Sequence, residues 1–195
     1  MERRELEVAA SRVAYMRGLL ALPLGVVFIL IGLGNLGWSP LQVPWVFFLG
    51  VGAAGLVWLG LNRYYTESYG RVTPGRQRQT RYAVATIFFG VAVIGGPLLD
   101  GWLHPRVSLF AALFAVAMLA WYALCVDLRT HHVLVWGTLF VAALLPVWGS
   151  FADPVSVAWL PIAAATILGG LLDHRELARG FGPTKGELTD RRASA

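Results

Sequence analysis

The sequence predicts an all-α integral membrane protein with six transmembrane helices, arranged as three hairpins, and with both termini on the inner side. Of its 195 residues, 57% are hydrophobic and only 14% are charged, whereas soluble domains have about 25% charged residues. The apolar residues form runs close to the roughly 20 residues that a helix needs to cross the hydrocarbon. With this topology every Lys and Arg except Arg106 falls in an inner segment, as the positive-inside rule requires.

The first two helices are predicted over residues 18–37 and 45–61. The basic segment before the first one resembles the start of a signal peptide. The apolar run is longer than a signal peptide needs and no cleavage-site pattern follows it, so we expect a retained helix. The second helix contains Gly50, Gly52 and Gly55, and the third contains Gly90 and Gly95. Small residues on one helix face predict close helix contacts, within the protomer or between chains.

The polar stretch 62–81 is predicted to be an inner loop, and it is the longest polar interval between apolar runs. It contains five arginines and one acid, Glu67. Tyrosines suit the membrane interface, and cations near an anionic leaflet attract its headgroups. We expect this loop and the C-terminal segment to bind anionic lipid or an acidic partner, through Arg63, Tyr64, Tyr65, Arg71, Arg76, Arg78, Arg81, Arg175 and Arg179.

Four further helices are predicted over residues 82–99, 107–126, 133–148 and 155–172. Each outer turn contains Gly, an aromatic residue and Pro, and each hairpin ends inside with Asn or Asp beside Arg. This pattern indicates either a true triplication or the ordinary chemistry of turns and helix ends. Residues 1–180 are expected to form one membrane domain, and 181–195 a polar tail.

Between the interfaces, the predicted spans contain no ionisable side chain, which argues against an ion-coupled or proton-coupled transporter. The single cysteine, Cys125, lies in an apolar run and is expected to be a buried packing residue. A carrier or sensor of an apolar ligand stays open as an alternative. The net charge of +5 comes from basic residues concentrated in the inner segments, as the positive-inside rule predicts, and does not indicate a nucleic-acid-binding surface.

Ionisable residues gather instead at the predicted inner helix ends. Three interpretations follow: anchoring of helix ends by Asp–Arg pairs, a metal site, or a pair of catalytic carboxylates. Imidazole and carboxylate ligands suit zinc or iron, but neighbouring histidines point in different directions on a helix. The metal alternative would use Asp127, His131, His132 and His174, and the aspartyl enzyme alternative would use Asp127 and Asp173.

Two resemblances bear on these alternatives. The segment around Asp127, ALCVDLRTHHVL, resembles the first-aspartate segment of prepilin peptidases, which implies that Asp127 would be a catalytic aspartate. The family's second aspartate follows Gly-x-Gly, whereas Asp173 follows GGLL, and the family's Ile-Pro is missing. The segments RYYTESYGRVTP and GLLDHREL resemble uncharacterised bacterial six-helix membrane proteins, some of which sit beside winged-helix regulators. That resemblance implies a bacterial inner membrane and no particular activity.

The sequence therefore predicts a non-enzymatic protein of the bacterial plasma membrane. We expect it to bind anionic lipid and a cytoplasmic or membrane protein partner, or a second copy of itself. No cofactor, metal or nucleic acid is expected. The alternatives are a membrane-embedded enzyme, aspartyl or metal-dependent, and a carrier or sensor of an apolar ligand.

Overall fold

The computed structural model describes residues 17–69, 76–103 and 105–180. The N-terminal segment, the centre of the predicted inner loop and the predicted tail lie outside these ranges. Every regular element within them is helical. The elements are η1 (Gly18–Leu20), α2 (Ala21–Asn35), η2 (Ser39–Gln42), α3 (Pro44–Tyr69), α4 (Arg76–Leu103), α5 (Leu109–Trp121), η3 (Tyr122–Val126), α6 (Thr130–Ala143), η4 (Trp148–Ser150) and α7 (Pro154–Gly180).

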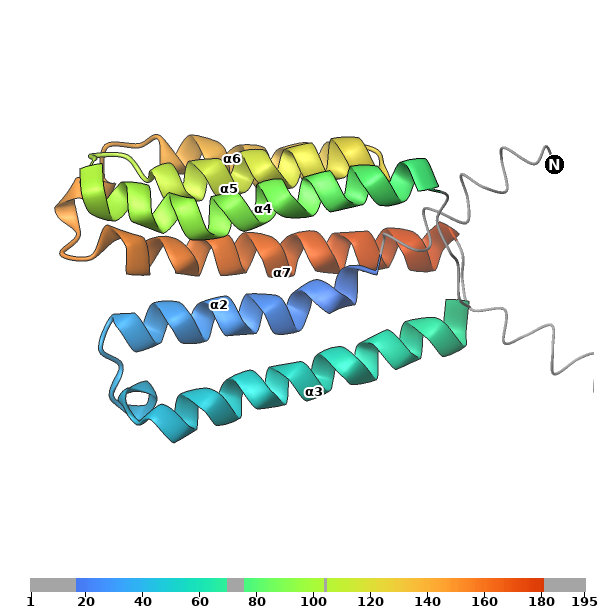
Figure 1. Ribbon diagram of the computed structural model, residues 1–195, viewed down its shortest axis with the longest axis horizontal. Coiled ribbons are helices and arrows are strands. Elements are labelled where there is room, and N and C mark those ends of the chain that lie inside the picture. The colour runs from blue at the N-terminus through green and yellow to red at the C-terminus, as the bar shows by residue number, and fades with distance from the viewer. Residues whose placement is uncertain (1–16, 70–75, 104, 181–195) are drawn as a thin grey trace, which may run out of the picture.

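The α-helices run back and forth along one common direction, and α7 lies between α2 on one side and α5 and α6 on the other (Figure 1). The largest interface is that of α2 with α7, followed by α4 with α5. Aromatic rings fill the centre. Phe28 meets Phe114 edge to face at 5.7 Å, and Phe110 meets Trp159 at 4.6 Å. The core is therefore built mainly by α5, α6 and α7, with Phe28 contributed by α2 and with α3 at the edge (Figure 1).

Five of the described helical segments are long and apolar enough to cross a membrane. They are Gly18–Asn35, Pro44–Tyr69, Gln79–Leu103, Leu109–Val126 and Pro154–Gly180. The prediction of an all-α protein with several membrane-crossing helices is confirmed to that extent. The helix predicted over 133–148 is shorter: α6 has 14 residues, which is about 21 Å of helix, against about 30 Å of hydrocarbon.

The predicted loop 62–81 is mostly helical, which corrects the sequence prediction. Helix α3 continues to Tyr69 and α4 begins at Arg76. Arg63 and Glu67 form an ion pair of 2.8 Å at i,i+4 spacing, and no glycine or proline occurs between Gly60 and Gly70. Polarity marks where a helix leaves the hydrocarbon, but only a breaker or a cap ends the helix itself.

The glycine contacts agree with the prediction only in part. A Cβ added at Gly52, Gly55 or Gly90 would meet nothing within 4 Å, because α3 and α4 lie largely exposed at the edges of the bundle. Gly50 does lie close to α2, because a Cβ there would be 2.8 Å from Cδ1 of Leu30. The closest approach is at Gly18, where a Cβ would lie 2.0 Å from the carbonyl oxygen of Gly170. The protomer therefore uses small residues where α2 crosses α7.

Asp100 lies inside a helix, although the predicted span ended at residue 99 and contained no carboxylate. Helix α4 extends beyond residue 99 and includes Asp100, which is 2% exposed. Its side chain accepts hydrogen bonds from the backbone N–H of Leu109 at 2.7 Å, that of Phe110 at 3.1 Å and the hydroxyl of Ser108 at 3.1 Å. These are donors at the beginning of α5, where a helix N-terminus favours negative charge. Asp100 therefore fixes the turn between α4 and α5.

Candidate functional site

Polar side chains converge on Asp173, at the end of the bundle where α6 begins and α7 ends. We call this the histidine end, and the residues Tyr122, His131, His132 and Asp173 the Asp173 cluster. The Tyr122 hydroxyl donates to Oδ2 of Asp173 at 2.7 Å. The Nε2 atoms of His131 and His132 lie 2.9 Å and 2.6 Å from Oδ1. Asp173 is only 3% exposed, so its charge is stabilised by three donors rather than by water.

The chain between α5 and α6 brings these donors together. The end of α5 forms a π-helical turn, η3, in which the N–H of Asp127 bonds to the carbonyl of Tyr122 at 3.0 Å. Asp127 then leaves the helix with φ of 119°, a value in the region that favours glycine. Helix α6 begins at Thr130, so both histidines lie in its first turn. The Tyr122 and His132 rings stack at 3.6 Å.

The hydrogen bonds assign the proton on His132. The backbone N–H of Arg129 donates to Nδ1 of His132 at 3.2 Å, so Nδ1 is an acceptor. In a neutral imidazole the other nitrogen then carries the proton. Nε2 of His132 therefore donates to Asp173, and both ring nitrogens of this fully buried side chain are in use.

His131, His132 and Asp173 also form a candidate metal group, with ligand atoms within 4.8 Å of one another. A metal on Nε2 of His132 would move the ring proton to Nδ1, where it would face the N–H of Arg129. Metal-binding histidines instead direct that N–H at a carboxylate or carbonyl. The cluster therefore fits a hydrogen-bonded network better than a metal site. The candidate group also differs from the set predicted from the sequence, because Asp173 takes the place of Asp127 and His174 is not a member.

His174 contacts a different partner, Tyr65 of α3. The Tyr65 hydroxyl accepts the backbone N–H of Leu19 at 3.0 Å and lies 2.9 Å from Nδ1 of His174, to which it can donate its own proton. Tyr65 is fully buried, which corrects the expectation that it faces lipid. Tyr64, in contrast, is 40% exposed. Tyr65 therefore links α3 to both η1 and α7.

For the predicted aspartyl-protease mechanism, the two carboxylates of Asp127 and Asp173 lie in different surroundings. That mechanism requires two carboxylates that share one proton. Both oxygens of Asp173 accept hydrogen bonds from Tyr122 and the two histidines. The Asp127 side chain is exposed, in the link that precedes α6.

The cations at the histidine end fall into two groups, apart from Arg17, which donates to the side chain of Asn62 at 3.0 Å. Arg129 pairs with Glu176, and Arg63 pairs with Glu67. Three more, Arg81, Arg175 and Arg179, are exposed and form no salt bridge with another residue in the described ranges. Of the other predicted lipid contacts, Arg71 lies outside the described residues, and Arg76 and Arg78 are placed only as part of the first turn of α4.

Comparison with protein-family models, with curated proteins and with solved structures gave no match. The site is therefore interpreted from its own geometry. Sequence reasoning missed Tyr122, because it lies within an apolar run. The tyrosine within this run could have indicated a polar contact, since a buried tyrosine hydroxyl usually has a hydrogen-bond partner.

Proposed function

We propose that this is a non-enzymatic, multi-pass protein of a bacterial plasma membrane whose inner face, at the histidine end, binds anionic lipid headgroups and a cytoplasmic or membrane protein partner. One observation carries the proposal. Asp173 is held by His131, His132 and Tyr122, and Glu67 and Glu176 are paired with Arg63 and Arg129. In contrast, the cations Arg81, Arg175 and Arg179 are exposed without a carboxylate partner among the described residues.

The burial of His132 and Asp173 within the Asp173 cluster supports a non-enzymatic role. A general acid, a general base or a nucleophile has to reach its substrate within hydrogen-bond distance. His132 is fully buried and Asp173 is 3% exposed. Their hydrogen bonds hold the beginning of α6 against α7, and this accounts for the cluster as a structural element.

The orientation is part of the proposal, with six crossings and both termini inside. It is supported by the distribution of arginines: those in the described ranges lie at the histidine end, except Arg106, which precedes α5 at the other end. Such a bias is typical of the cytoplasmic side. Cysteine labelling of intact cells tests it in a Cys125→Ala background. Ser39→Cys should react with an impermeant reagent, whereas Arg179→Cys should react only after lysis.

Lipid retention tests the binding function. The protein is reconstituted with equal phosphatidylglycerol and phosphatidylcholine, extracted in mild detergent and measured by native mass spectrometry. Each interfacial cation is worth about 1 kcal/mol, so replacing Arg81, Arg175 and Arg179 with Gln should weaken phosphatidylglycerol binding on the order of 100-fold. The matched control is Arg106→Gln, an exposed arginine at the opposite end. Equal retention by the triple variant and the control would refute the proposal.

A further inference from the structure

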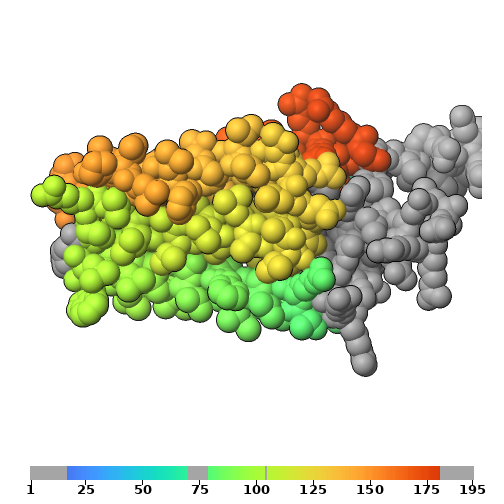
Figure 2. Space-filling model, turned by 90° about the horizontal axis from the view of Figure 1, so that it is seen from above, coloured from blue at the N-terminus to red at the C-terminus, as the bar shows by residue number. Residues whose placement is uncertain are grey.

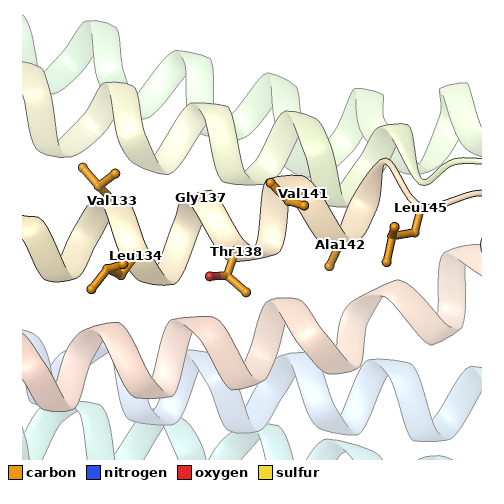
Figure 3. A pocket seen from close by; sticks show the side chains of 7 residues that line it. All are labelled: Val133, Leu134, Gly137, Thr138, Val141, Ala142 and Leu145. Carbon is orange, nitrogen blue, oxygen red and sulfur yellow. The ribbon is translucent and has the colours of Figure 1, made fainter.

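An apolar groove runs along the outside of α6 and into the seam between α6 and α7. Two adjoining hollows, of about 500 and 420 Å³, share Leu134, Thr138 and Ala142. In Figure 3 these three side chains lie on the side of α6 that faces the next ribbon. Helix α7 contributes Pro161 and Leu168 to the opposite wall. The Thr138 hydroxyl is the one polar side-chain group among the lining residues.

The wall formed by α7 continues into two exposed arginines. Arg175 follows Leu168 by seven residues, and Arg179 follows it by eleven. Separations of seven and eleven residues return to nearly the same face of an α-helix, within about 20°. At the histidine end, the last part of α7 lies beside the beginning of α6 (Figure 2). Beyond Leu168, where the groove ends on its α7 side, the same face of α7 therefore carries two guanidinium groups, about 10 Å and about 16 Å further along the helix.

We propose that this groove is a binding site for one anionic phospholipid, with an acyl chain along α6 and the phosphate on Arg175 and Arg179. The inference rests on the proposed function and gives it a specific site. From Val133 to Ala142 the groove follows about 13 Å of helix. One leaflet is about half of the 30 Å hydrocarbon thickness. The groove begins at Leu168, about 10 Å of helix from Arg175. A chain whose phosphate lies on the arginines would therefore enter the groove, and occupy the part nearest the histidine end, within its own leaflet.

Charge favours a phospholipid as the occupant. The nearest acid along α7, Glu176, is held by Arg129 and lies 3.7 Å from His131, so it leaves Arg175 and Arg179 available. Two arginines one helical turn apart can bind a phosphate through several charge-assisted hydrogen bonds. The lining offers one side-chain hydroxyl for hydrogen bonding, which suits an acyl chain better than a peptide.

The experiment fills the groove without changing its charge. Ala164 lines the groove and is exposed, so Ala164→Trp should occupy it, and Thr138→Phe should do the same from α6. The matched control is Ile94→Trp, at a 68% exposed position of α4. The probe is palmitoyl-oleoyl-phosphatidylglycerol, counted per protein by native mass spectrometry, against the phosphatidylcholine analogue.

We expect one retained phosphatidylglycerol in the wild-type protein and in Ile94→Trp, and at least tenfold less in Ala164→Trp and Thr138→Phe. Arg175→Gln with Arg179→Gln should lower retention on the order of 30-fold. Normal phosphatidylglycerol retention in both filled variants would overturn the inference, and so would equal retention of phosphatidylcholine by the wild-type protein. A dimer, or a bound protein seated at Ala164, would overturn it as well. If the filled variants bind normally while the arginine variants do not, the groove inference fails and headgroup binding stands.

Discussion

The crossing of α2 and α7 makes a quantitative prediction about stability. A Cβ added at Gly170 would lie 2.4 Å from the carbonyl oxygen of Gly18 and 2.7 Å from Cβ of Ala21. These are backbone and first side-chain atoms, so no rotamer change relieves the contact. Ordinary carbon contacts need about 3.5 Å, so η1 and α7 would have to separate by about 1 Å. Gly170→Ala should therefore cost about 1–3 kcal/mol through overpacking.

Gly60→Ala is the matched control, because a Cβ there would meet nothing within 4 Å. Alanine is favoured over glycine in a helix by about 1 kcal/mol, so this variant should be slightly stabilised. The same helix-propensity gain applies at Gly170, so the difference between the two variants isolates the steric cost.

Thermal unfolding in detergent, followed by far-ultraviolet circular dichroism, measures this difference. For a chain of this size 1 kcal/mol corresponds to about 2–4 °C in Tm. Gly170→Ala should therefore unfold about 2–12 °C below Gly60→Ala. Equal Tm values for the two variants, or a higher Tm for Gly170→Ala, would refute the packing argument.

Three further predictions concern the polar groups of the histidine end, each measured by Tm in detergent. Asp173→Asn leaves buried histidine donors facing an amide and should cost about 1–3 kcal/mol; an unchanged Tm would show that the network is not stabilising. Tyr65→Phe removes a hydroxyl shared by two helices and should cost about 1–2 kcal/mol, whereas Tyr64→Phe should change little, so equal effects would contradict the assignment. Asp127→Gly relieves a φ that disfavours side chains and should stabilise by about 1 kcal/mol, and Asp127→Ala should give no gain.

Much of the fold could be predicted because a membrane constrains the sequence directly. The hydrocarbon thickness sets the length of the apolar runs, and arginines concentrate in the segments on the inner side. The apolar runs predicted the helices, and the arginines predicted which helix ends lie together. The sequence predicts a loop at residues 62–69 because polarity ends a membrane span, whereas the Arg63–Glu67 pair continues the helix. Ser108 caps α5 by accepting the N–H of Ala111, and its second bond, to Asp100, was hidden because Asp100 lies in another helix.

The candidate site was predictable in composition but not in pairing. His131 and His132 differ by about 100° around a helix, which suggested separate directions. Both nevertheless reach Oδ1 of Asp173, because α7 places that carboxylate between the two rings, whose centroids are 4.0 Å apart. Which aspartate the histidines meet depends on how α6 and α7 cross, and no local pattern encodes that crossing.

The pairing of α2 with α7 also has a consequence for biosynthesis. These helices form the largest interface of the described chain, yet more than a hundred residues separate them. While a ribosome is still translating α3 to α6, Gly18 of η1 and Phe28 of α2 lack their contacts with α7. At that stage His131 and His132 also lack the carboxylate of Asp173. The polypeptide therefore passes through a partly assembled stage in the bilayer that ends only when α7 inserts. A product truncated before Pro154 would keep those surfaces unpaired and be a natural target for membrane proteases.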